Sequence, residues 1–162
     1  MIKKLGAAAQ TALANTLNTN INTQIDAVAA AWNDGIPLPH ITNIYAGYRT
    51  VIGEYPAIVV NAQKGKQTAN GASLWAEIDH IVEITVIVQA DDAPTLDAQI
   101  QRYLVAIWQV LMQNQQLDGS LSGLAGVDPM EYGRSGMYPL EKSTLLMEAA
   151  AWSVTVHVIE SV

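Results

Sequence analysis

The stretch from Ile81 to Leu111 constrains the fold most, because it reads as a strand followed within a few residues by a helix. In Ile81–Gln89, branched aliphatic residues occupy every second position and so share one face: Val82, Ile84, Val86 and Val88. The other face mixes polar and apolar residues: Ile81, Glu83, Thr85, Ile87 and Gln89. This alternation is typical of a half-buried strand, and it lacks the continuous apolar run of a strand buried on both faces. We therefore expect antiparallel neighbouring strands, with helix covering one face of the sheet.

The second half of that stretch, Leu96–Leu111, predicts an amphipathic helix. Its apolar residues recur at steps of three and four and form one stripe: Leu96, Ile100, Tyr103, Leu104, Ile107, Trp108 and Leu111. The residues predicted to lie off this stripe are Asp97, Gln101, Arg102 and Gln109. Pro94 suits the first turn of a helix, and Asp91 and Asp92 place negative charge at its positive end. A helix of this length is marginal alone, so it must pack on a sheet or another helix.

The N-terminal region predicts a second, shorter helix. Apolar residues at helical spacing mark residues 21–32, and Asn20 or Asn22 would cap the helix. The preceding residues 1–20 are rich in Ala, Thr and Asn, and they predict either a weak helix or a flexible arm.

Two further strands complete the predicted sheet. Ala57–Val60 is a short apolar run that follows a proline, and Trp152–Ile159 alternates in the same way as Ile81–Gln89. We expect Trp152–Ile159 to pair with Ile81–Gln89. A chain of 162 residues suits one domain, 1–162, with a substantial core. The predicted class is α+β, with an antiparallel or mixed sheet, helices on one face and a long β-hairpin extension.

Residues 61–79 are that hairpin extension, a stretch too polar for a core and too long for an ordinary loop. Trp75 would be costly to leave in water unless a partner covers it. Lys64 and Lys66 could contact an acidic partner. Lys64, Lys66 and Trp75 are therefore the candidate protein-interface residues. The alternative interpretation is an ordinary mobile hairpin whose lysines are solvated.

Composition excludes several classes of function. The chain has no cysteine, which removes disulfides, thiolate zinc sites and cysteine nucleophiles. Its formal net charge is −7, and so acidic a chain is a poor general binder of nucleic acid. No apolar run is long enough to span a membrane.

No set of residues in the sequence indicates a reaction. The three histidines are far apart, and His80 and Glu83 would lie on opposite faces of a strand, which argues against a metal site. We expect His80 on the surface and His157 half-exposed on the last strand. Asp91 and Asp92 are better explained as a helix cap than as a catalytic pair. The sequence predicts no catalytic, cofactor-binding or metal-binding residue, and hence a protein that is not an enzyme.

Two aromatic residues and two loops were candidates for ligand sites. Tyr103 and Trp108 are better explained as core residues than as a platform for a ligand. Lys64 and Lys66 flank a glycine, but the spacing of a phosphate-binding loop is missing. The serines near glycines do not form the turn that carries a hydrolase nucleophile.

The order of the predicted elements resembles the tail terminator, or tail completion, proteins of tailed bacteriophages. After the first helix come Tyr55-Pro56-Ala57-Ile58-Val59-Val60, a long hairpin and the strand Ile81–Gln89. The helix Leu96–Leu111, the segment Leu117-Asp118-Gly119 and the strand Trp152–Ile159 follow. The resemblance covers residues 21–160 and rests on pattern, because the family has no invariant chemical residues.

The resemblance implies a structural virion protein without catalytic residues or cofactors. Such proteins form a ring, usually of six copies, that caps the tail tube, ends its polymerisation and joins the tail to the head or neck. The implied partners are other copies of the chain, the tail tube protein and the head–tail connector, and DNA can pass through the lumen. The implied location is the virion, assembled in the host cytoplasm. Two alternatives stay open: another neck or minor tail protein of similar fold, and a ferredoxin-like ligand-binding or enzyme domain.

Overall fold

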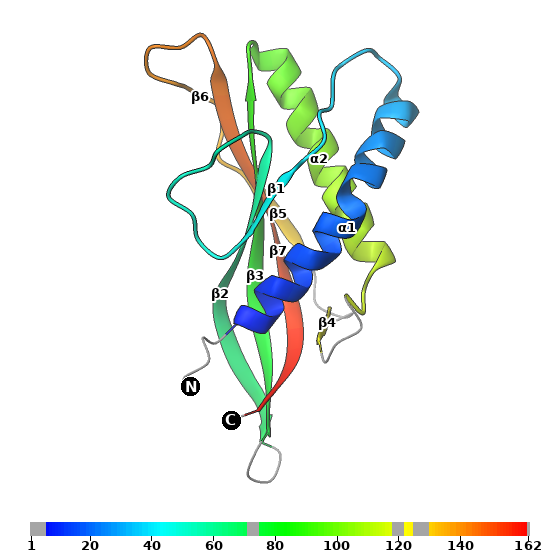
Figure 1. Ribbon diagram of the computed structural model, residues 1–162, viewed down its shortest axis with the longest axis vertical. Coiled ribbons are helices and arrows are strands. Elements are labelled where there is room, and N and C mark those ends of the chain that lie inside the picture. The colour runs from blue at the N-terminus through cyan, green and yellow to red at the C-terminus, as the bar shows by residue number, and fades with distance from the viewer. Residues whose placement is uncertain (1–5, 71–74, 118–121, 125–129, 162) are drawn as a thin grey trace.

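A computed structural model describes residues 6–70, 75–117, 122–124 and 130–161. Within these residues the chain forms two helices and one seven-stranded sheet (Figure 1). The elements in chain order are α1 (Ala7–Trp32), β1 (Asn43–Ala46), β2 (Ala57–Asn70), β3 (Trp75–Ala90), α2 (Ala93–Gln113), β4 (Ser122–Leu124), β5 (Glu131–Arg134), β6 (Tyr138–Pro139) and β7 (Leu146–Ser161). The predicted α+β class is confirmed.

Three long antiparallel strands form the centre of the sheet. All 16 residues of β3 pair with β7, in a register that runs from Trp75 opposite Ser161 to Ala90 opposite Leu146. On its other side β3 pairs with β2 from Ile87 to Ala76, with two register shifts along the way. The predicted hairpin extension is therefore confirmed, since residues 61–70 continue β2 as paired strand. The predicted pairing of the strands that contain Ile81–Gln89 and Trp152–Ile159 is also confirmed.

The two edges of the sheet are built differently. At one edge, β1 runs parallel to the start of β2, with Asn43 opposite Ala57. At the other edge, three short strands pair with β7 one after another: β6 with residues 146–147, β5 with residues 150–153 and β4 with residues 156–158. Among the described strands, β1 alone pairs in parallel and makes the sheet mixed, and the other pairings are antiparallel.

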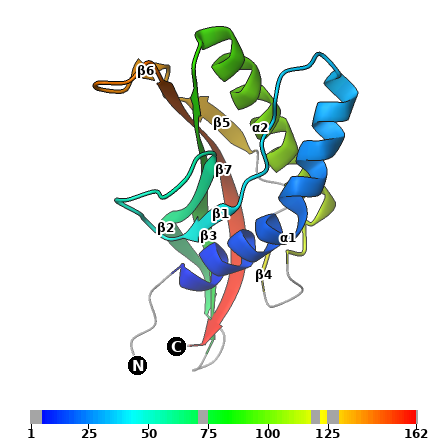
Figure 2. The ribbon, with the colours of Figure 1, turned by 45° about the horizontal axis from the view of Figure 1, so that its top comes forward.

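Both helices pack on one face of this sheet (Figure 2). The alternating residues predicted to share a face on β3 are buried beneath the helices, together with apolar residues at alternate positions of β7: Val82, Ile84, Val86, Val88, Ala150, Val154, Val156 and Val158. Their neighbours in the strand, such as Glu83 and Thr85, lie half-exposed on the opposite face, which we call the open face. The alternation in the sequence thus marks the boundary between core and surface.

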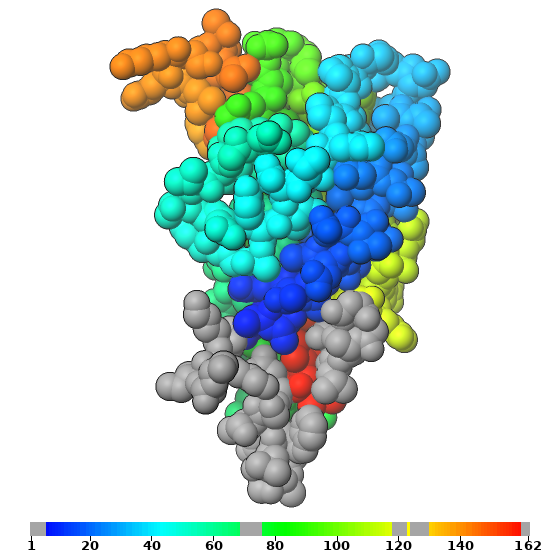
Figure 3. All heavy atoms as spheres, in the orientation of Figure 1, coloured from blue at the N-terminus to red at the C-terminus, as the bar shows by residue number. Residues whose placement is uncertain are grey.

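Helix α1 is one continuous helix of 26 residues, so of the two alternatives for residues 1–20 the structure shows a helix from Ala7 onward. It starts at Ala7 rather than near Asn20 or Asn22. A regular series of buried side chains runs along it: Ala9, Leu13, Leu17, Ile21, Ile25 and Val28. Gly6 precedes the helix with φ +79°, and a Cβ there would lie 2.7 Å from Cβ of Ala62. A glycine at this position therefore allows the helix to start against the sheet. On the surface, α1 and the segment that contains β1 lie side by side (Figure 3).

The connection between α1 and β1 is held by polar side chains of α2. Pro37 and Pro39 keep it irregular, so its carbonyl groups need partners outside a regular ladder. Gln99 Nε2 donates to Pro37 O at 2.7 Å, and the Tyr103 hydroxyl donates to Pro39 O at 2.7 Å. Burial raises the pKa of Tyr103, so its hydroxyl keeps the proton that it donates.

The same connection explains why the prediction for Arg102 was wrong. Arg102 was expected off the buried stripe of its helix, yet its side chain is buried. Its guanidinium donates to the Asp34 carboxylate and lies 4.7 Å from the ring centre of Trp32, at the end of α1. The hydrogen bond from Arg102 holds the pKa of Asp34 below its usual value. The helix stripe misses this residue because its burial comes from an irregular segment, which periodicity does not describe.

The start of α2 agrees with the sequence. Pro94 lies in the first turn, and the Asp92 carboxylate accepts a hydrogen bond from Thr95 N at 2.9 Å. That hydrogen bond from the Thr95 backbone lowers the pKa of Asp92. The interpretation of Asp92 as a helix cap is confirmed.

We expect Tyr103→Phe to lower the free energy of unfolding by about 1 kcal/mol, because it removes one buried hydrogen bond and leaves the Pro39 carbonyl without that donor. Urea denaturation followed by circular dichroism measures the change. Tyr138→Phe is the matched control, since the Tyr138 ring is exposed. Equal stability of the two variants would show that the Tyr103 hydroxyl does not anchor the connection.

Candidate functional site

The predicted interface residues lie on the hairpin formed by β2 and β3. Lys64 stands opposite Ile81 and Lys66 opposite Asp79, so both lysines belong to the open face. Both side chains are exposed, and within the described residues neither forms an ion pair. Trp75 begins β3, but its side chain lies outside the part of the structure that is described, as do residues 71–74. The hairpin end of the sheet extends beyond α1 (Figure 1).

Two histidines lie on the central strands beside the hairpin, His80 on β3 and His157 on β7. On the open face, His157 Nδ1 lies 2.7 Å from the Asp79 carboxylate, and His157 is half-exposed as predicted. His80 was predicted on the surface, and that prediction was wrong, because it is buried on the face toward the helices. A Cβ at Gly65 would lie 2.8 Å from His80 Nδ1. The absence of a side chain at Gly65 therefore makes room for the imidazole, a pairing between strands that the sequence does not display.

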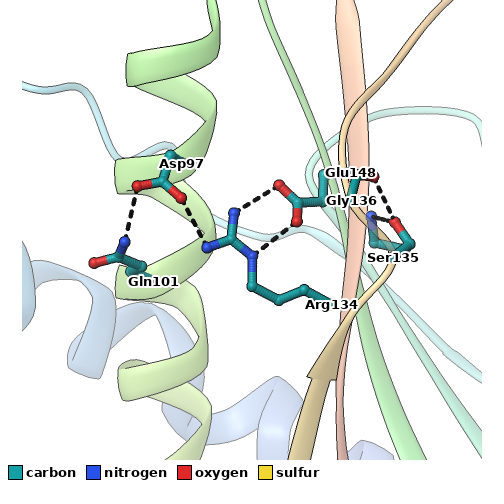
Figure 4. A network of polar contacts seen from close by, with 7 residues as sticks. Asp97, Gln101, Arg134, Ser135, Gly136 and Glu148 are labelled. Carbon is teal, nitrogen blue, oxygen red and sulfur yellow. Dashed lines mark hydrogen bonds and ion pairs between the residues drawn. The ribbon is translucent and has the colours of Figure 1, made fainter.

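A charged network connects the short strand β5 to α2 and β7 (Figure 4). Arg134 on β5 donates to the Glu148 carboxylate through Nε at 2.7 Å and Nη2 at 2.8 Å. Its third nitrogen, Nη1, lies 2.7 Å from the Asp97 carboxylate on α2. The hydrogen bonds to Glu148 raise the pKa of Arg134, so the guanidinium stays charged. Because Glu148 is buried, it depends on this bidentate partner.

Next to this network is a groove lined by aromatic side chains, which we call the aromatic groove. It has a volume of about 370 Å³ and lies between α2, β5 and β7, lined by Gln101, Leu104, Val105, Trp108, Tyr132, Arg134 and Trp152. The ring centres of Tyr132 and Trp152 are 5.3 Å apart. Trp152 Nε1 donates a hydrogen bond to Leu104 O at 2.9 Å. The sequence predicted Tyr103 and Trp108 as core residues. Tyr103 is fully buried, but Trp108 is 42% exposed at this groove, so its assignment to the core was wrong.

The aromatic groove offers mainly aromatic surface, and several of its polar groups are already paired. The three guanidinium nitrogens of Arg134 are paired with Glu148 and Asp97, and Gln101 Nε2 donates to Asp97. The Trp152 N–H is paired as well. An apolar side chain can therefore enter the groove without breaking these bonds. Aromatic residues and arginine are also enriched in protein–protein interfaces.

The described residues contain no group of three or more His, Asp or Glu side chains arranged to hold a metal ion. No helix among them is long and apolar enough to cross a membrane.

No family model matches the sequence, and no curated protein matches it. Among solved structures, the chain is similar to a chain from the "Virion of native gene transfer agent (GTA) particle". The two share 15% sequence identity with a TM-score of 0.38, over 90% of this chain and 97% of that one.

We expect Arg134→Met to lower the free energy of unfolding by roughly 3 kcal/mol, because it leaves the buried Glu148 carboxylate without its bidentate partner. The double variant Arg134→Met, Glu148→Met removes both charges and should recover most of that loss. Denaturant unfolding of the wild type and both variants measures the difference. A double variant no more stable than the single one would show that the buried charge is not the cause.

Proposed function

We propose that this chain is a structural virion protein of a tailed phage, of the tail terminator type. In this proposal about six copies form a ring that caps the tail tube, ends its polymerisation and joins the tail to the head or neck. The location is then the virion, and the chain has no catalytic residue. The observation that supports the proposal is the element order, which resembles that of this family: two helices on one face of the sheet and a long hairpin between β2 and β3.

The aromatic groove gives little support to a ligand-binding or enzymatic domain. Such a domain would need several free polar groups that converge on one pocket. In this groove, Arg134 and the N–H groups of Gln101 and Trp152 are already paired within the chain. A neck protein of similar fold would share these features. It would differ from a tail terminator in binding the head connector and not the tail tube.

We assign the hairpin to contact with the tail tube. Lys64 and Lys66 lie on one face of paired strand, and neither forms an ion pair among the described residues. Long lysine side chains without a carboxylate partner can meet an acidic surface without losing an existing bond. The hairpin extends past the helices, so it can reach a partner before the rest of the domain does (Figure 1).

Light scattering of the purified chain, with negative-stain images of the same sample, tests the ring. The second part of the experiment adds the chain to growing tail tubes and measures tube length. Closed rings together with tubes that stop growing support a tail terminator. Binding only to the head connector would instead identify a neck protein, and the absence of both binding events would contradict the proposal.

The double variant Lys64→Glu, Lys66→Glu should bind tubes roughly tenfold more weakly, because it reverses the charge that meets the tube, while ring mass is unchanged. Wild-type binding should weaken as salt is added, since exposed charges are screened. Lys142→Glu is the matched control, because Lys142 is also an exposed lysine but lies between β6 and β7. If Lys142→Glu reduces tube binding equally, the effect belongs to net charge and not to the hairpin.

A further inference from the structure

The connection between β1 and β2, residues 47–56, carries large apolar side chains that nothing within the described residues covers. Tyr48 is 79% exposed and Val51 is 78% exposed. This connection stands out from the body of the molecule in two views (Figures 1 and 2). We call it the β1–β2 loop. Exposed apolar residues that lie close together on a projecting segment are typical of an interaction site.

The aromatic groove lies at the other edge of the sheet. The loop follows β1, the edge strand beside β2, whereas the groove is lined by Tyr132 of β5, on the far side of β7. Tyr132 is 63% exposed and Trp108 is 42% exposed. Because β2, β3 and β7 separate the two sites, a copy of the chain cannot fill its own groove with its own loop.

One cation of the loop has no carboxylate partner, whereas the rim of the groove is negative. The loop carries Arg49 and one acid, Glu54. The Arg49 guanidinium lies 4.9 Å from the ring centre of Tyr45 and, within the described residues, forms no ion pair. At the rim of the groove, the single guanidinium of Arg134 faces two carboxylates, so this network keeps a net negative charge.

We propose that the β1–β2 loop of one copy docks in the aromatic groove of the next copy. The apolar side chains of Tyr48 and Val51 enter the groove, which has a volume of about 370 Å³. Arg49 then approaches the negative rim of the groove. The inference rests on the proposed ring, and it assigns the contact between copies to the sheet edges rather than to the hairpin.

A contact between two different surfaces has a direct geometric consequence. Each copy offers a loop to one neighbour and a groove to the other, which makes the contact heterologous. Heterologous contacts close into a ring when the rotation between copies divides a full turn. The arrangement also leaves the hairpin free for a different partner.

Cross-linking between engineered cysteines tests the docking, and the chain has no native cysteine to interfere. The double variant Tyr48→Cys, Trp108→Cys is treated with a short bis-maleimide and resolved on a denaturing gel. We expect a ladder of linked copies that ends at the number of subunits in the ring. A mixture of the two single variants should give linked dimers, whereas each single variant alone should give none.

The matched control is the double variant Tyr48→Cys, Tyr138→Cys. Tyr138 is 44% exposed and lies at the same edge of the sheet as Tyr132, but it does not line the groove. An equally strong ladder from this control, or no ladder from the groove variant, would overturn the docking.

A second variant separates this inference from the proposed function. Val51→Asp places a charge on the exposed loop, where it should not disturb the core, and it should reduce ring mass to that of smaller species. Rings that persist in Val51→Asp and still cap tubes would overturn the docking and leave the tail terminator proposal intact. A wild type that forms cross-linked rings but never caps tubes would support the docking and contradict the proposed function.

Discussion

The structure depends on the pairing of β3 with β7 over the full length of both strands. Sixteen residue pairs in one unbroken register place the alternating apolar side chains, Val82 to Val88 on β3 and Ala150 to Val158 on β7, on the face toward the helices. A shift by one residue would turn this apolar set to the open face and the charged set into the core. The other strands add to this pair, β2 on one side and β4, β5 and β6 on the other. The register therefore determines where the hairpin ends and which side chains meet across the network of Arg134.

The parts of the fold that follow a period could be predicted from the sequence. The alternation in Ile81–Gln89 and the stripe in Leu96–Leu111 correctly indicated a sheet with helices on one face. The residues whose burial was predicted wrongly are buried or exposed for reasons that sequence periodicity does not reflect. Arg102 is buried by an irregular connection, and His80 is buried because Gly65 opposite it lacks a side chain.

The predictions for sites divide in the same way. Trp108 fits the apolar stripe of its helix, but the sheet beneath that position ends in short strands that leave its ring partly uncovered. The aromatic groove is formed by Trp108, Tyr132 and Trp152, which meet in space but come from three distant parts of the sequence. Only a prediction of which strands and helices are neighbours could have brought them together. Lys64 and Lys66 lie exposed on the hairpin, and their role as interface residues remains a prediction.

The way in which β7 is bordered has a consequence for assembly. An uncovered strand edge can recruit a strand from any other molecule, and such growth has no natural end. Here residues 146–147, 150–153 and 156–158 of that edge already pair with the chain's own β6, β5 and β4. In the proposed ring, copies would therefore have little backbone to share at this side and would recognise one another through side chains of fixed geometry. The size of the assembly would then be set by an angle between neighbours and not by the supply of subunits, as the proposed role at the end of a tail tube requires.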